Sequence, residues 1–299
     1  MATNNAHRNC YNFVAVVEEL LERRLSEEKI QRLEDFYVEF SFYRDLRRGR
    51  IKNLPLRHEV MRIADHLLCT LAERNRLLNA ANYVPVIAYV EGEMLEHALR
   101  VGKRIIDDLP LAAFVITRDD TMHHWNDVGL RLFNTIEKVE LQRPIEERSI
   151  LRYIFAPDTP VYDVFTNYRR SFRWHRYTCR LNVLRFKQDN VFCQHDQWYR
   201  ERVESLMDLP EFRHTWDEIQ IDTGMEKIMS DMPPGMIVPE YLTHIYTPAG
   251  DEFRLRGMQI DYMGWGYPRI FAYTYDGEES RRIFTKLGIP TPDNGFGYL

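Results

Sequence analysis

The sequence is poor in cysteine, in long apolar runs and in catalytic signature motifs. No run approaches ~18 consecutive apolar residues, and the first thirty residues lack the apolar core of a signal peptide. We therefore expect a soluble, cytoplasmic protein. No Walker A loop, GxSxG or GxGxxG motif occurs, so no enzymatic activity is predicted. The cysteines show neither CxxC spacing nor a disulfide framework, and we expect reduced thiols at Cys10, Cys69, Cys179 and Cys193.

The histidines offer no dedicated metal-ligand spacing. None belongs to a His-x-x-x-His pair on a helix, so a metal site is not predicted. The histidines considered are His123, His124, His175, His195 and His244. No single histidine or cysteine stands out as the ligand of a haem or a flavin, and no cofactor is predicted.

The charge balance restricts any nucleic-acid binding to a local surface. The net charge is −5, so the chain as a whole is not a generic polyanion binder. Aromatic residues are abundant, with 17 Tyr, 16 Phe and 5 Trp. Because aromatic side chains bury large areas and often line pockets, they indicate large cores, a ligand pocket, or both. The 299 residues are enough for two domains.

Residues 1–86 predict a small bundle of five helices. The first helix covers residues 13–24, where apolar residues recur at helical spacing. Ser26 is expected to cap a second helix over residues 26–36. A third helix, over residues 39–48, ends at Gly49, and Pro55 opens a fourth. The fifth covers residues 71–81.

A basic patch follows the third predicted helix. Seven basic residues and two acids lie between Arg44 and Arg62. Such a patch is either a solvated face or a set of phosphate and base contacts. The third helix also carries Phe40, Phe42 and Tyr43, where short polar base readers would be expected. The candidate DNA-binding residues are Ser41, Arg44, Arg47, Arg48, Arg50 and Lys52.

The order of residues around this patch is informative. Its elements are Leu46-Arg47-Arg48-Gly49, a basic loop to Pro55, Val60, Ile63-Ala64-Asp65, Leu67, Ala72-Glu73-Arg74, Leu77-Leu78, Ala80-Ala81 and Tyr83. This order resembles the second half of the helix-turn-helix domain of Xre-type bacterial repressors. The resemblance implies a domain over residues 1–86 that binds double-stranded DNA, as a homodimer. The segment before the third helix is about two residues longer than in that family, so a helix-turn-helix without DNA affinity is the alternative.

Residues 87–108 predict a connector helix. Apolar residues form a nearly continuous amphipathic stripe from Met94 to Leu109. One interpretation is a further packed helix. The other is a signalling and dimer-forming connector between two domains.

Residues 109–290 predict an α+β domain, followed by a tail over residues 291–299. Strands are expected over residues 112–116 and 122–125, with a helix directly after Asn126. Helices are expected over residues 149–155, 162–187 and 196–207 and from residue 209 onward. Three further strands lie within residues 236–250, 251–263 and 268–277. Five antiparallel strands with helices between the second and third give the layout of a PAS-like domain.

A basic and aromatic run within this domain has two interpretations. Seven basic residues and no acid lie between Arg169 and Lys187. Arginines interleaved with aromatic residues can stack nucleobases. A helix that buries its aromatic residues and shows its arginines to solvent or to acidic neighbours gives the same pattern, and we favour this second interpretation.

Several short segments of the second domain carry a further resemblance. They are Ala113-Phe114-Val115, Trp125-Asn126, Leu132-Phe133, Leu151 to Phe155 with Pro157, Trp174 to Leu184-Arg185, Leu209-Pro210-Glu211-Phe212-Arg213 with Trp216, Pro234-Gly235, Ala272-Tyr273-Thr274, Asp276-Gly277 and Ser280. These segments resemble the MmyB-like ligand-binding domain. The resemblance implies a transcription regulator with a DNA-binding domain followed by a PAS-like sensor.

An apolar and aromatic pocket suits a hydrophobic small molecule, such as a fatty-acid-like compound or an aromatic metabolite. The candidate ligand-binding residues are Phe114, Ile116, Tyr153, Phe155, Phe172, Trp174, Tyr177, Leu181, Met258, Tyr262, Phe271 and Tyr273. The alternative to a ligand-responsive DNA-binding regulator is a ligand-binding or protein-interaction module that does not bind DNA.

Overall fold

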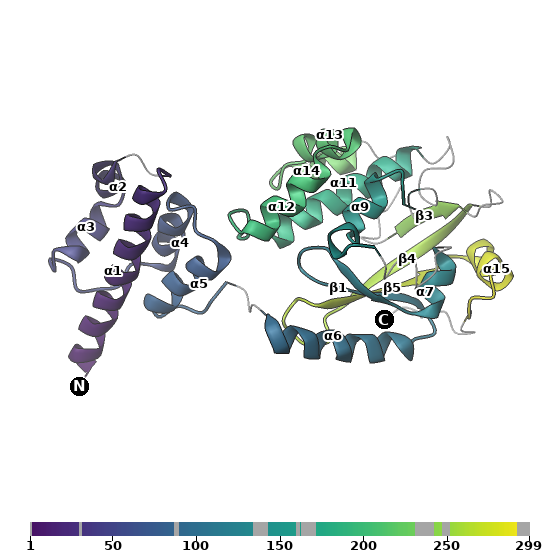
Figure 1. Cartoon of the computed structure of the whole chain (residues 1–299), viewed down its shortest axis with the longest axis horizontal. Coiled ribbons are helices and arrows are strands. Elements are labelled where there is room, and N and C mark those ends of the chain that lie inside the picture. Colours follow the sequence, from purple (N-terminus) through teal and green to yellow (C-terminus); the bar gives the residue numbers. More distant parts are fainter. Residues whose placement is uncertain are drawn as a thin grey trace. The chain divides into compact units, whose positions relative to one another are not determined.

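The computed structural model describes residues 2–29, 32–86, 90–133, 143–159, 162, 172–230, 242–246 and 252–291. The chain divides into two compact units (Figure 1). The N-terminal unit comprises Met1–Ala88 and Phe192–Arg200, and the sheet unit comprises Tyr89–Val191 and Glu201–Leu299. The fold combines helices with an antiparallel sheet and begins with a helical region, as the sequence predicted. None of the described helices is long and apolar enough to cross a membrane.

Helices α1 (Ala2–Ser26), α2 (Leu33–Glu39), α3 (Ser41–Arg47), α4 (Arg57–His66) and α5 (Leu71–Ala80) pack around one core in the N-terminal unit. The predicted apolar stripe of the first helix is confirmed, because Phe13, Val17 and Leu20 are fully buried. Phe36 and Phe40 are also fully buried, with ring centroids 4.9 Å apart. Burial of each such Phe side chain contributes about 1.5–3 kcal/mol.

The predicted start of the second helix at Ser26 is wrong. Ser26 is the last residue of α1, and its hydroxyl donates a hydrogen bond to the Arg23 carbonyl instead of accepting one from a following N–H group. Glu28 then has φ +56°, a left-handed conformation that ends the helix. A serine near a helix boundary is compatible with either end, and here the apolar stripe of α1 continues up to it.

The sheet of the sheet unit has the strand order β2-β1-β5-β4-β3, and neighbouring strands are antiparallel. Its strands are β1 (Ala112–Ile116), β2 (Met122–Trp125), β3 (Leu242–Tyr246), β4 (Glu252–Ile260) and β5 (Arg269–Tyr275). The predicted bounds of β1 and β2 are confirmed. Parts of the other predicted strands, including the turn expected at residues 248–250, lie outside the described residues.

One face of the sheet, the outer face, is covered by α6 (Gly92–Asp107). Ile106 packs there with Val115 and Ala272. Gly102 lies where α6 comes close to Tyr262, and a Cβ atom at this position would be only 2.5 Å from the Tyr262 hydroxyl oxygen. The predicted connector is therefore a helix of the sheet unit, and its apolar stripe is buried against the strands.

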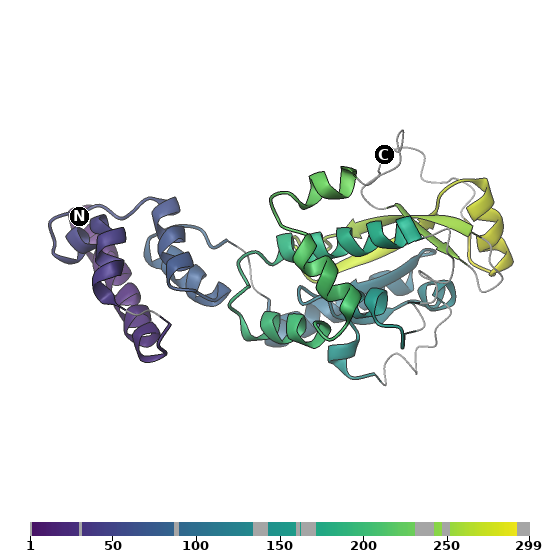
Figure 2. The same ribbon diagram turned by 90° about the horizontal axis from the view of Figure 1, so that it is seen from above.

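The opposite, inner face of the sheet packs against helices (Figures 1 and 2). Short helices α7 (Asp127–Leu132), α9 (Ile150–Phe155) and α15 (Glu278–Lys286) contribute to its core, and α15 had not been predicted. The remaining described helical elements are η1 (Ile145–Glu147), α11 (Phe172–Asp189), α12 (Gln197–Leu206), α13 (Pro210–Glu218) and α14 (Gly224–Ser230). Figure 2, viewed from above, shows green helices crossing over the strands.

Glu218 joins α11, α13 and α14. Its carboxylate accepts a hydrogen bond from Arg180 Nε at 2.9 Å and a second one from Arg180 Nη2, and it also pairs with Arg176 and Lys227. Arg180 is only 2% exposed. The arginines of α11 thus meet an acidic neighbour while Tyr177 is buried, as the structural interpretation of the basic run predicted. Residues 163–171 of that run lie outside the described residues.

Asn126 fixes the corner between β2, α7 and the end of α6. Its side chain is 3% exposed. Oδ1 accepts the backbone N–H groups of Ala113 at 3.0 Å and Gly129 at 2.8 Å, so it also caps the first turn of α7. Nδ2 donates to the carbonyl groups of Ile106 at 2.9 Å and Leu111 at 2.7 Å. One side chain therefore satisfies backbone groups from three elements.

Candidate functional site

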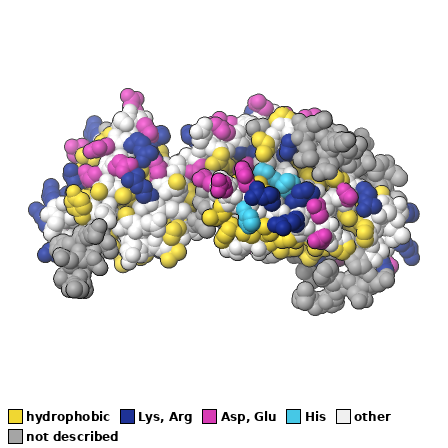
Figure 3. All heavy atoms as spheres, turned by 60° about the horizontal axis from the view of Figure 1, so that its bottom comes forward, with side chains coloured by type: hydrophobic (Ala, Val, Ile, Leu, Met, Phe, Trp, Pro, Cys, Tyr) yellow, Lys and Arg dark blue, Asp and Glu magenta, His cyan; other side chains and the backbone are white. Residues whose placement is uncertain are grey.

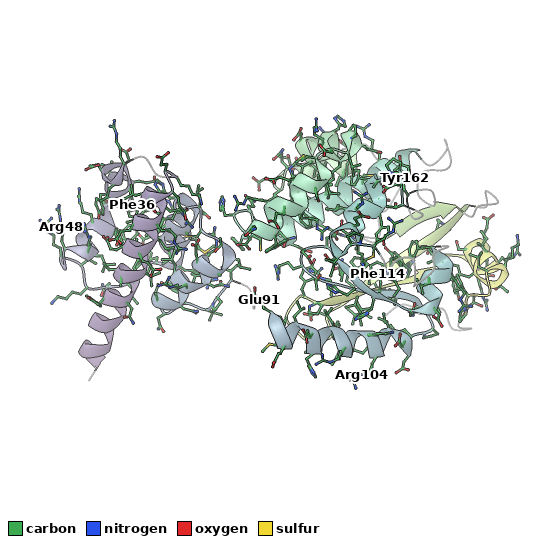
Figure 4. The ribbon with its side chains drawn as sticks, in the orientation of Figure 1. Phe36, Arg48, Glu91, Arg104, Phe114 and Tyr162 are labelled. Atoms are coloured by element: carbon green, nitrogen blue, oxygen red, sulfur yellow. The ribbon has the colours of Figure 1, made fainter. Side chains whose placement is uncertain are left out.

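The predicted DNA-binding residues lie on α3 and on the loop that follows it. Ser41, Arg47, Arg48, Arg50 and Lys52 are exposed. In Figure 4, Arg48 points outward from the N-terminal unit. Arg47, Arg48, Arg50 and Lys52 therefore lie at the C-terminal end of α3 and in the loop after it, whereas Ser41 is the first residue of α3.

Several cations of this patch are already neutralised by acids of the same unit. Arg47 Nε lies 3.1 Å from a Glu18 oxygen, and Arg47 Nη1 donates to the Tyr37 hydroxyl at 2.6 Å. Arg50 pairs with Asp45 at 3.4 Å.

Arg44, Arg48 and Lys52, in contrast, have no acidic partner among the described residues. Arg44 Nε is buried without a hydrogen-bond partner. Among the predicted DNA-binding residues that the structure describes, these three are therefore the cations without an acidic partner.

The aromatic residues of the third predicted helix belong to the core. Phe40 and Tyr43 are fully buried, and Phe42 packs against them. The Tyr43 hydroxyl donates to Glu18 at 2.7 Å, and burial raises the pKa of Tyr43 well above its usual value. Phe40 is also the single residue between α2 and α3. A helix-turn-helix motif normally has a turn of ~3–4 residues at this point, so the connection here is shorter.

The inner face of the sheet carries a cluster of aromatic rings, the inner cluster, formed by Phe114, Trp125, Phe133, Tyr153, Phe271 and Tyr273. Phe114 is at its centre, with ring centroids 5.0 Å from Trp125 and 5.6 Å from Phe271. The β1–β2 register places Phe114 opposite Trp125, and the β1–β5 register places it opposite Phe271. Since paired residues of neighbouring strands share a face, the register itself assembles the cluster.

The structure separates the predicted ligand-binding residues into three groups. Phe114, Ile116, Tyr153, Phe271 and Tyr273 lie in or against the inner cluster. Phe155, Tyr177 and Leu181 are buried on α9 and α11, where Phe155 meets the ring of Phe212. The side chains of Phe172 and Trp174 lie outside the described residues. The third group, Met258 and Tyr262, packs with α6 on the outer face and does not join the inner cluster.

Strand register explains the position of Met258. Gln259 pairs with Phe271, and Met258 pairs with Ala272, so Met258 points away from the face that carries Phe271. Two aromatic residues of the cluster, Trp125 and Phe133, were not among the candidates. The alternation of β2 could have identified Trp125 once its pairing with Phe114 was known.

Tyr273 gives the inner cluster a polar group without a partner. Its ring centroid lies 6.0 Å from Phe114 and 5.9 Å from Phe133. Burial raises the pKa of Tyr273 to about 12, while the positive charge of Arg185 lowers it. Among the described residues, no hydrogen bond of the Tyr273 hydroxyl is found. The Tyr273 side chain is half-buried, so its hydroxyl is open to water or to a ligand atom.

The turn between β1 and β2 holds a polar network. Asp119 accepts hydrogen bonds from the hydroxyl groups of Thr117 and Thr121, each at 2.5 Å. His123 Nε2 lies 3.1 Å from the Thr117 hydroxyl oxygen. The same hydroxyl oxygen lies 3.3 Å from the Thr121 carbonyl oxygen, so Thr117 joins Asp119, Thr121 and His123 in one network. Among the residues that the structure describes, no group of three His, Cys, Asp or Glu side chains could hold a metal ion.

Part of the sheet unit is similar to a known family of domains. Residues 101–231 match the family described as the MmyB-like transcription regulator ligand binding domain. The matched range begins within α6, includes β1, β2 and Trp125 of the inner cluster, and ends after α14. This part of the chain is therefore similar to the ligand-sensing part of transcription regulators, as the sequence resemblance indicated. No curated protein matches the chain.

Proposed function

We propose that the chain is a transcription regulator that senses a hydrophobic small molecule through its sheet unit and binds DNA through its N-terminal unit. The match of residues 101–231 to a ligand-binding domain of transcription regulators carries this proposal. The inner cluster supports it, because it combines apolar rings with the Tyr273 hydroxyl, which has no hydrogen-bond partner among the described residues. We propose no catalytic role for the chain, because its sequence holds no Walker A, GxSxG or GxGxxG motif.

We propose that the sheet unit is a PAS-like sensor. The strand order β2-β1-β5-β4-β3, with helices between β2 and β3, fits the expected layout. A ligand with an apolar body would contact the inner cluster, and a hydrogen-bond acceptor on it would meet Tyr273. Native mass spectrometry of the purified full chain tests this proposal by revealing a retained small molecule.

The variant Y273F then locates the ligand. It removes only the unpaired hydroxyl, so we expect weaker binding by about three- to tenfold, the value of one hydrogen bond, with little change in stability. The matched control is Y262F. It removes the hydroxyl of Tyr262, which donates to the Ala98 carbonyl on the outer face. Equal ligand affinities for Y273F and Y262F would contradict the placement at the inner cluster.

We propose that DNA phosphates contact the end of α3 and the loop after it, in a domain of the Xre helix-turn-helix type. Arg48 and Lys52 support this proposal because both are exposed and neither has an acidic partner among the described residues. In a salt titration of DNA affinity, R48A and K52A should each reduce the slope by about one unit. The control R76A removes the same charge from an arginine of α5, away from the α3 patch in sequence, which already pairs with Glu19 of α1. This variant should leave the slope unchanged.

A second candidate function is a ligand-binding module that has lost DNA affinity. It is favoured by the single-residue connection at Phe40 and by the buried aromatic residues of α3. This candidate predicts tight small-molecule binding together with negligible, salt-insensitive DNA binding. Binding of a specific upstream duplex no tighter than random duplex at physiological salt would select it over the regulator.

A further inference from the structure

The exposed face of α6 has an ordered arrangement of charge. Its first half carries Glu93 and Glu96, and its second half carries Arg100 and Arg104 together with the ion pair of Lys103 and Asp107. The side chains of Glu93, Glu96, Arg100 and Arg104 are exposed. In Figure 4, Arg104 points away from the sheet. On the face shown in Figure 3, acidic side chains gather beside a group of basic side chains and histidines.

The helix dipole accounts for only part of this order. It favours Glu93 in the first turn and Arg104 in the last turn. Glu96 and Arg100 lie further inside the helix, where the dipole effect has faded, and the ion pair between them is long and exposed, at 3.7 Å. Glu93 and Arg104 have no ion-pair partner among the described residues. The charges of this face are therefore available to an external partner.

A second copy of the same helix has matching charges when it runs antiparallel. In a two-fold arrangement centred near residue 98, Glu93 faces Arg104 of the partner helix, and Glu96 faces Arg100. Each contact occurs twice, because a two-fold axis repeats it. Met94, which is 54% exposed, then faces the half-buried Val101 of the partner helix and adds apolar contact.

We propose that the exposed face of α6 is an interface between two copies of this chain, paired antiparallel through these complementary charges. The proposal goes beyond DNA and ligand binding and depends on neither. The 16 residues of α6 span about 24 Å, so this contact alone buries less area than an obligate dimer requires. The association is therefore weak and falls with salt, which screens exposed charges.

Two reciprocal variants of the full chain test the pairing. E93K/E96K replaces the two acids of the first half by bases, and R100E/R104E replaces two bases of the second half by acids, while both variants keep the Lys103–Asp107 ion pair. Each variant alone places like charges opposite each other, so its dimer dissociation constant at low salt should rise by at least about tenfold over that of the wild type. An equimolar mixture of the two variants again places acids opposite bases and should associate as a heterodimer.

Sedimentation velocity at low salt and matched concentrations measures these states. The control E278K/E279K makes the same charge change on α15 and should dimerise like the wild type. The proposal is overturned if the wild type is monomeric at every concentration reached, or if the reciprocal variants dimerise as the wild type does. It is equally overturned if the mixture stays monomeric, or if the α15 control loses the dimer as well.

Discussion

Replacement of Asn126 by Ala should strongly destabilise the sheet unit, because it removes the hydrogen-bond partners of several buried backbone groups at once. The substitution removes the acceptor of the Ala113 and Gly129 N–H groups, and it removes the donor that serves the carbonyls of Ile106 and Leu111. Each buried N–H group left without a partner costs about 1–3 kcal/mol. Loss of the α7 cap is part of the same cost, so we expect N126A to lower the free energy of unfolding by about 3–5 kcal/mol.

Urea unfolding followed by tryptophan fluorescence measures this effect. Four of the five tryptophans belong to the sheet unit, and Trp125 is next to the mutated position, whereas Trp198 belongs to the N-terminal unit, so the signal reports mainly on the sheet unit. With a slope of about 2–3 kcal/mol per molar urea, the expected loss lowers the transition midpoint by about 1–2 M.

The matched control is N182A on α11. The Asn182 side chain donates only to the Thr178 carbonyl, at 2.8 Å, within the same helix. That carbonyl retains its helical backbone hydrogen bond, and Ala is the better helix former, so the change should be below about 1 kcal/mol. The reasoning is refuted if N126A shifts the midpoint no more than N182A.

Two further predictions concern charged groups of the sheet unit. E218Q removes a charge that pairs with the buried guanidinium of Arg180 and should cost about 3 kcal/mol in urea unfolding, whereas R176A, which removes an exposed partner of Glu218, should cost less than about 1 kcal/mol. Burial, with smaller contributions from Asp119 and Asp189, raises the pKa of Asp120 to about 7, from ~3.9 in the unfolded chain. The folded state therefore holds this proton longer, so the contribution of Asp120 to stability is complete below about pH 4 and is lost as pH rises through 7. D120N keeps an acceptor for the Leu151 N–H group and should flatten this pH dependence, and an unchanged difference between unfolding midpoints at pH 5 and pH 8 would contradict the assignment.

Signals within a few residues of one another in the sequence were enough to predict β1, β2 and the helix that follows Asn126. The bounds of β1 and β2 follow from two apolar runs around a polar turn, and the helix after Asn126 follows from a capping residue before an apolar pattern. The start of α2 was predicted wrongly because a serine can either cap the start of a helix or lie at its end. Here the Ser26 hydroxyl donates to the Arg23 carbonyl at the end of α1, and residue type alone does not distinguish these two roles.

The candidate site depended on contacts that are distant in sequence. The face on which Met258 lies is set by the register between β4 and β5, and a shift of one residue would reverse it. Likewise, Arg47 is neutralised by Glu18, which lies on another helix. Residue types indicated an aromatic core in the second domain and a basic end of the third helix, whereas pairing between distant residues decided which side chains remain free.

Trp125 and Asn126 are adjacent in sequence but act on opposite faces of the sheet. The ring of Trp125 lies in the inner cluster, 5.0 Å from that of Phe114, while the amide of Asn126 holds the end of α6 on the outer face. A ligand can shift a conformational equilibrium only by as much as its affinity differs between the two states. A typical allosteric coupling of about 1–3 kcal/mol equals one or two hydrogen bonds of the kind that Asn126 makes. If a ligand binds at the inner cluster as proposed, a backbone shift at this corner that breaks one such bond would change the equilibrium position of α6 by a free energy of this size.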